Sequence, residues 1–191
     1  MLRLFIALPL PPALEQRLGE VIEAFKPRGV AVKWSKPGNI HLTVKFLGDT
    51  EEKLIPDISR AIDHVAVRAT KIKAVVDTLG GFPNLKRPRV IWAGSSLGIE
   101  PAARVAREVD LAMRQLGFEK EKRPFKAHLT LGRVRQGRSI EDLIPALNSY
   151  KLEPVTVELD KLTLFKSTLT PTGPIYEILH EAPLGQERFE G

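Results

Sequence analysis

The chain has 191 residues, of which 43% are hydrophobic and 27% charged, a composition that disfavours both long disorder and a membrane protein. It has no cysteine, which excludes disulfides, thiolate nucleophiles and cysteine-ligated zinc and favours a cytoplasmic protein. Lys and Arg outnumber Asp and Glu by 29 to 23, giving a net charge of +6; this favours an anionic partner if the excess gathers on one face.

Strands and helices are predicted to alternate in the first half of the chain. Residues 2–10 are apolar but too short to cross a bilayer, and we interpret them as a buried strand. Residues 12–26 have apolar positions at helical spacing, and residues 39–48 alternate like a half-buried strand. Asp49, with Glu52 three residues later, resembles a capping box, which predicts a helix whose apolar stripe runs from residue 54 to 65.

The second half of the chain is predicted to repeat this order. Strands at 71–79 and 88–96 are predicted to form a hairpin with a long loop, because turn-forming residues lie between them. They are followed by a helix from Pro101 to Gly117, a strand beginning at His128, a helix capped by Ser139, and strands at 154–165 and 174–182. A shift of 87 residues lays one half over the other, which predicts a single two-lobed domain, 1–191, with an internal repeat.

Two similar stretches carry the candidate chemistry: HLTVKFLG at 41–48 and HLTLGRV at 128–134. Imidazole accepts or donates a proton near neutral pH, so His41 and His128 suit a base and an acid in one displacement. Strand alternation places Thr43 about 6–7 Å along the same face as His41, where its hydroxyl reaches a phosphoryl oxygen. The same alternation predicts Lys45 and Leu47 on that face. If the halves are related by a pseudo-twofold axis, both histidines share one cleft.

With their KP-NIHLT-KFLG and PFKAHLTLGR contexts, these motifs resemble the two-histidine phosphoesterase superfamily, and most closely its RNA 2',3'-cyclic phosphodiesterases, long called 2'-5' RNA ligases. The resemblance implies an α+β, duplicated, bilobal fold in which two antiparallel sheets with outer helices flank a central groove. It implies that His41 is the proton donor and His128 the proton acceptor. It also implies that Thr43 and Thr130 hold phosphate oxygens.

Several further residues are candidates for phosphate or RNA contacts. Arg133 matches an arginine of the family, although strict alternation turns it away from Thr130, so that its participation requires a bulge at Gly132 or a reach around the strand edge. Basic residues near the motifs suit an RNA backbone, and aromatic residues just before them suit either base stacking or the core. These candidates are Lys45, Arg123, Lys126, Trp34 and Phe125.

No metal or nucleotide cofactor is expected, because no close cluster of ligands surrounds either histidine and no phosphate-binding glycine loop is present. His64 and His180 are interpreted as structural or exposed. The expected partner is RNA with a 2',3'-cyclic phosphate end, such as transfer RNA fragments, or a cyclic nucleotide. No membrane or protein partner is expected, and the protein is expected to be a monomer. Reversible 2'-5' ligation and a non-catalytic RNA-binding module remain as alternatives.

Overall fold

The computed structural model describes residues 1–28, 31–135, 138 and 140–185. Its elements are, in chain order, β1 (Leu2–Pro9), α1 (Pro12–Phe25), β2 (Val32–Trp34), β3 (His41–Thr50), the 3-10 helix η1 (Glu52–Leu54), α2 (Ile55–Arg68), β4 (Ile72–Phe82), β5 (Val90–Leu97), α3 (Ile99–Gln115), β6 (Leu129–Val134), α4 (Ile144–Ser149), β7 (Val155–Leu159), β8 (Lys161–Thr170) and β9 (Gly173–Pro183).

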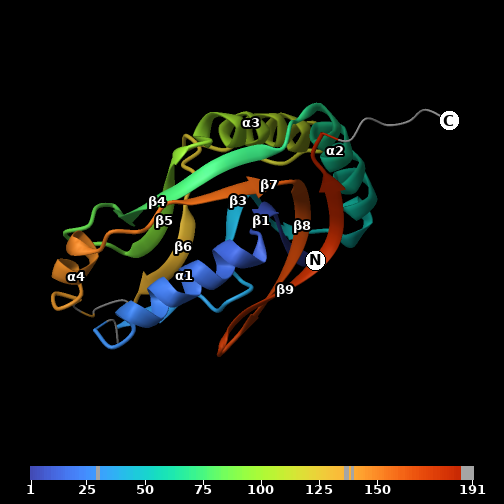
Figure 1. Ribbon diagram of the computed structural model, residues 1–191. Coiled ribbons are helices and arrows are strands. Elements are labelled where there is room, and N and C mark those ends of the chain that lie inside the picture. The colour runs from blue at the N-terminus through green and yellow to red at the C-terminus, as the bar shows by residue number, and fades with distance from the viewer. Residues whose placement is uncertain (29–30, 136–137, 139, 186–191) are drawn as a thin grey trace.

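The strands form one sheet in the order β7-β4-β5-β6-β3-β1-β8-β9, with β2 also paired to β6. Every strand pair in the described part of the chain is antiparallel. The predicted α+β class is therefore confirmed. The two expected sheets are joined into one, because β3 and β6 meet through the pairing of Leu42 with Leu129. Figure 1 shows β4 and β5 on one side of this junction and β8 and β9 on the other.

The strand order is symmetric about the junction. On one side β3 is followed by β1, and on the other β6 is followed by β5. The shift of 87 residues relates these strands: Leu42 corresponds to Leu129, its own pairing partner. An ancestral duplication stays a prediction, but the topology sets the two motif strands side by side at the centre of the sheet.

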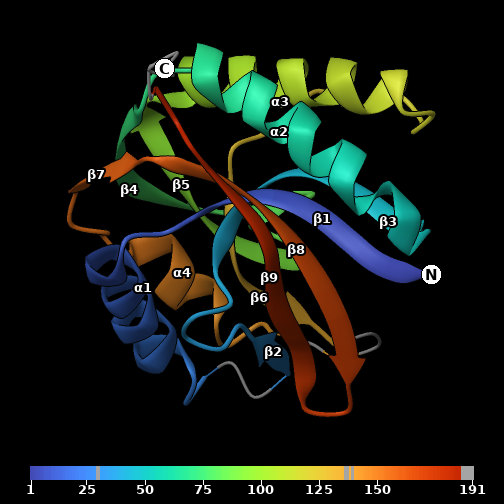
Figure 2. The same ribbon diagram turned by 90° about the vertical axis from the view of Figure 1, so that its right-hand side faces the viewer.

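Helices cover the sheet at two ends. In both views α2 and α3 lie together along one end, and α1 and α4 lie at the other (Figures 1 and 2). The predicted stripe of α1 is confirmed, because Leu14, Leu18, Val21, Ile22 and Phe25 are all buried. One large hydrophobic core runs through both groups of strands. No helix in the described ranges is long and apolar enough to span a membrane.

Two predictions about the ends of elements are wrong, and a third is not tested. The capping box at Asp49 is wrong, because β3 continues to Thr50 and α2 begins at Ile55 without a side-chain cap. The predicted strand 154–165 is two strands that separate at Asp160, since β7 pairs with β4 and β8 pairs with β1. The predicted cap Ser139 lies outside the described residues.

Candidate active site

The pairing of β3 with β6 brings four motif side chains together. Leu42 faces Leu129 in antiparallel register, so the residues on either side of them pair in crossed order: His41 lies beside Thr130, and Thr43 lies beside His128. Both leucines are buried, and side chains alternate along a strand, so these four residues occupy the other face. Directly opposed residues in such a pair have Cβ atoms about 4.5–5.5 Å apart. Each histidine is therefore flanked by the threonine of the other motif.

A β-bulge follows the threonine in each motif. In β3, Thr43 pairs with Ala7 and Lys45 with Ile6, which leaves Val44 as the extra residue. In β6, Thr130 pairs with Trp92 and Gly132 with Ile91, which leaves Leu131 as the extra residue. Val44 and Leu131 are themselves 87 residues apart. Because a bulge inserts one residue, it reverses the alternation beyond it.

The bulges change which residues reach the site. Arg133, placed on the far face by strict alternation, lies on the face of Thr130 and lines the same groove as Thr130. Phe46, five residues after His41, lines this groove as well and is 63% exposed. The prediction that Lys45 shares the face of His41 is wrong, because the bulge at Val44 turns Lys45 toward the interior, where it is 4% exposed.

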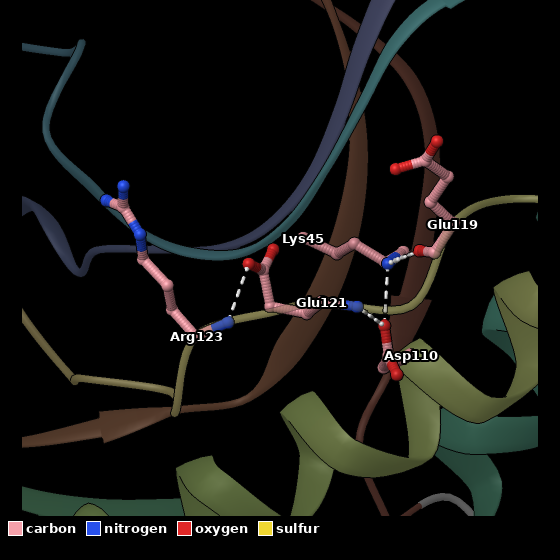
Figure 3. A network of polar contacts seen from close by, with 5 residues as sticks. All are labelled: Lys45, Asp110, Glu119, Glu121 and Arg123. Atoms are coloured by element: carbon pink, nitrogen blue, oxygen red, sulfur yellow. Dashed lines mark hydrogen bonds and ion pairs between the residues drawn. The ribbon is translucent and has the colours of Figure 1, made fainter.

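Lys45 is bound within the protein instead of facing RNA. Figure 3 shows its ammonium group between α3 and the connection that leads to the second motif. Nζ donates to Asp110 Oδ1 at 2.6 Å and to the carbonyl oxygen of Glu119 at 2.9 Å. The same Asp110 oxygen accepts from the backbone N–H of Glu121 at 2.9 Å. This network holds the segment that precedes His128.

A groove of about 450 Å³ contains His41, Thr43 and Thr130. Four basic residues line it and no acidic residue does, among the parts of the chain that the structure describes. Its charge therefore favours an anionic ligand. His128 is not among the lining residues; it stands next to Thr43 at the strand junction. The basic lining residues are Arg3, Lys33, Lys36 and Arg133.

Three aromatic rings surround His41. The ring centroids of Phe5, Tyr176 and Phe165 lie 4.8, 5.2 and 6.0 Å from that of His41. Burial lowers the pKa of His41 to about 4, a hydrogen bond with the backbone of Asn39 acts in the opposite direction, and the nearby His128 lowers the pKa further. In the free protein His41 is therefore neutral at neutral pH.

His128 is held by a hydrogen bond that fixes its tautomer. Its Nδ1 lies 2.7 Å from the carbonyl oxygen of Lys126, and a carbonyl only accepts, so Nδ1 carries the hydrogen in neutral imidazole. Nε2 is then left with a lone pair that can accept a proton. The ring also meets the Phe82 ring edge-on, with centroids 5.0 Å apart. Lys126 and Asn39 each lie two residues before the histidine they contact.

The remaining predicted residues are divided between site and core. Lys126 lies close to His128, with Nζ 5.6 Å from the centroid of Phe82. Trp34 lines the groove but is half-buried and lies nearly parallel to Phe25, at 6.3 Å. Phe125 packs against the core. Arg123 is exposed, and its backbone N–H donates to Glu121.

Sequence reasoning missed the aromatic residues Phe5, Phe46 and Tyr176, which come from β1, β3 and β9. No local motif marks Phe5 or Tyr176, because each reaches His41 through strand pairings distant in sequence. His180 is structural as interpreted, since its Nε2 lies 2.7 Å from Asp63 of α2. The described ranges contain no group of three or more His, Asp or Glu residues able to hold a metal ion.

Known proteins resemble the chain over nearly its whole length. A profile of LigT-like phosphoesterases matches residues 8–92 and 97–176, which include both motifs. The RNA 2',3'-cyclic phosphodiesterase of Methanocaldococcus jannaschii is 35% identical over 181 residues, covering 94% of this chain and 99% of the relative. That of Thermotoga maritima is 33% identical over 201 residues, covering 100% and 97%.

Solved structures share the fold. A crystal structure of a Thermus thermophilus protein superposes with a TM-score of 0.80 at 27% identity, covering 97% of this chain and 99% of that chain. Escherichia coli LigT complexed with 3'-AMP has a TM-score of 0.77 with the same coverage, and its 22% identity supports the fold alone. The family profile and the sequence identity to curated relatives show the family as well as the fold: this chain belongs to the LigT-like phosphoesterases and is a hydrolase.

Proposed function

We propose that this protein hydrolyses the 2',3'-cyclic phosphate at an RNA end and leaves a 2'-phosphate, without a metal ion. The names of the relatives in Methanocaldococcus jannaschii and Thermotoga maritima support the substrate class. The observation that carries the mechanism is the antiparallel register of Leu42 with Leu129. This register supports a site with an imidazole and a threonine hydroxyl on each flank of the strand junction, and the basic groove that contains His41, Thr43 and Thr130 opens beside it.

The proposed displacement is in line and uses the two histidines in opposite roles. His128, with Nδ1 hydrogen-bonded to Lys126, takes a proton from water at Nε2 as the water oxygen forms its bond to phosphorus. Protonated His41 gives its proton to the departing 3'-oxygen as the P–O bond breaks. Thr43 and Thr130 donate hydrogen bonds to the non-bridging oxygens, and Arg133 balances the charge that develops on them.

The acid role of His41 depends on the substrate. An imidazole with a pKa of about 4 in the free protein is mostly neutral at neutral pH, but an anionic phosphate within a few ångströms favours the charged form and raises the pKa. A buried imidazolium is also a strong acid, which favours proton transfer to the leaving oxygen. The groove thus supplies the acid form when the substrate binds.

The test compares His41→Asn and His128→Asn with His180→Asn, on an oligonucleotide that ends in a 2',3'-cyclic phosphate. Loss of an acid or a base should lower kcat by about 10²–10⁴-fold. His180 does not line the groove and is paired with Asp63, so His180→Asn should keep turnover. The wild type should retain its activity in a chelator. Near-normal turnover by either motif variant would refute the roles, and product formed only after metal addition would refute a metal-free reaction.

The same assay addresses 2'-5' ligation, in which a ribose 5'-hydroxyl replaces water as the nucleophile that attacks phosphorus and the 3'-oxygen departs as before. An oligonucleotide with a 5'-hydroxyl end is added at graded concentration. A joined product that forms alongside the 2'-phosphate, and that both motif variants lose, would show that one site catalyses both reactions.

A further inference from the structure

A second basic cavity lies at the outer end of β6. It has a volume of about 930 Å³ and is lined by the turn between β4 and β5 together with Arg135, Arg138 and three residues between 140 and 144. Five basic residues line it, against Glu141 as the acidic residue among the described lining residues. The basic residues are Lys86, Arg87, Arg89, Arg135 and Arg138.

The turn that forms one wall of this cavity is ordered by its own hydrogen bonds. The side-chain oxygen of Asn84 accepts from the backbone N–H groups of Lys86 and Arg87, at 2.9 and 3.1 Å. The N–H of Arg89 donates to the carbonyl oxygen of Phe82, and the carbonyl oxygen of Arg89 accepts from Val134 of β6. The basic side chains therefore project from a fixed backbone attached to the motif strand.

Two connections lead from the active site to this cavity. The first is Phe82, whose ring contacts His128 and whose neighbour Pro83 already lines the cavity. The second is β6 itself. Arg133 lines the catalytic groove, and Arg135, two residues further on, lines the second cavity. Val134, which lies between them, also lines the second cavity, so β6 leads directly from the groove to the cavity.

We propose that this cavity binds the phosphodiester backbone of the nucleotides upstream of the terminal cyclic phosphate. The inference rests on the proposed function, because it assumes that the cyclic phosphate sits between His41 and His128. It names the substrate more narrowly: an RNA strand end rather than a free cyclic nucleotide. A strand seated at His128 passes Phe82 and reaches the guanidinium groups of Arg87 and Arg135, where each phosphate contact releases counterions.

The experiment uses the double variant Arg87→Gln/Arg135→Gln and two substrates, a 2',3'-cyclic mononucleotide and oligonucleotides of graded length that end in a cyclic phosphate. The expected result is a roughly 3- to 30-fold loss of kcat/KM on the oligonucleotides. Hydrolysis of the mononucleotide should stay unchanged. The log–log salt dependence of oligonucleotide binding should become shallower by about 1.4, since each lost contact to single-stranded nucleic acid removes about 0.7.

Two control variants isolate the position and the charge. Arg104→Gln/Arg107→Gln removes the same charge from the exposed face of α3, at the other end of the molecule (Figure 1), and should leave both substrates unaffected. Arg87→Lys/Arg135→Lys should restore most of the oligonucleotide preference. Equal losses on both substrates, or equal losses from the α3 variant, would overturn the proposal.

The outcomes also separate this inference from the proposed function. If the wild type hydrolyses neither substrate, the proposed function fails. Fluorescence anisotropy then compares how tightly the wild type and the cavity variant bind the same oligonucleotides. Unchanged affinity in the variant overturns the proposal that the cavity binds the strand. If both substrates are hydrolysed and the cavity variant behaves as wild type, only the cavity assignment is wrong.

Discussion

Replacing Asp110 should destabilise the protein more than replacing its partner Lys45. The two groups are 2.6 Å apart, but they are not equally buried: the side chain of Lys45 is 4% exposed and that of Asp110 is 16% exposed. Asp110→Ala leaves a buried ammonium group with the carbonyl of Glu119 as its remaining partner. Lys45→Met leaves a carboxylate that keeps the N–H of Glu121 and some contact with water.

The magnitudes follow from the cost of an unpaired buried charge. Removing one partner of a buried pair costs about 3–5 kcal/mol, and Asp110→Ala should lie in that range. Lys45→Met should cost roughly 2–3 kcal/mol, because the remaining carboxylate is better solvated and the methionine fills most of the lysine volume. The double variant Lys45→Met/Asp110→Ala should cost less than the sum of the two single changes, with a coupling of about 1–3 kcal/mol.

Urea unfolding of the four proteins of this cycle measures these differences, and its pH dependence adds a signature. In the wild type, burial raises the pKa of Asp110, but the hydrogen bonds from Lys45 and Glu121 and the charges of Lys45 and Arg114 together lower it below its usual value. The stabilisation from the ionised carboxylate is therefore lost as pH falls through the lowered value. Equal costs for the two single variants, or additive costs, would refute the reasoning.

Three further predictions concern the site. Phe5→Leu removes the ring closest to His41 and should raise the pKa of His41 from about 4 toward 6.5, as measured by NMR titration. If His41 is the acid, kcat/KM at alkaline pH should rise together with this pKa. An unchanged pKa in the variant would show that Phe5 does not cause the desolvation of His41. Since the folded pKa of His41 is below the unfolded value, the wild type should lose up to roughly 3 kcal/mol of stability as pH falls from 6.5 to 4, a slope that His41→Asn should flatten. Gly132→Ala would place a Cβ 2.6 Å from Val32 and 2.8 Å from Trp34. It should therefore lower the free energy of unfolding by about 1–3 kcal/mol and lower kcat/KM by displacing Arg133. A variant as stable in urea as the wild type would contradict this prediction.

Much of the fold was predictable because it rests on local patterns. The stripe of α1 and the main strands are repeated apolar spacings, which a sequence displays directly. The division of residues 154–165 at Asp160 was not predictable in this way, since it depends on β7 and β8 having different partners. Strand partners are set by contacts between distant residues, which no local pattern encodes.

The bulges explain the errors at the site. Both motifs look like regular strands in the sequence, so alternation placed Lys45 with His41 and turned Arg133 away. The residue inserted after the threonine of each motif reverses both assignments. Gly132 was a partial signal, because glycine within a strand marks a bulge or a close backbone approach; here a side chain at this position would meet Val32 and Trp34 of β2. Val44, an ordinary strand residue, gave no comparable signal.

The two halves of the site have equivalent backbones but different surroundings, and this difference suits acid and base chemistry. Each histidine contacts the backbone of the residue two positions before it, and each is followed by a bulge. The surroundings then diverge: three aromatic rings from the β1, β8 and β9 side enclose His41, whereas His128 meets the edge of Phe82 next to the ammonium group of Lys126. Two histidines in identical environments would compete for one proton. Different environments favour different roles for two titratable groups, so the side chains outside the motifs support the proposed division in which His41 is the acid and His128 is the base.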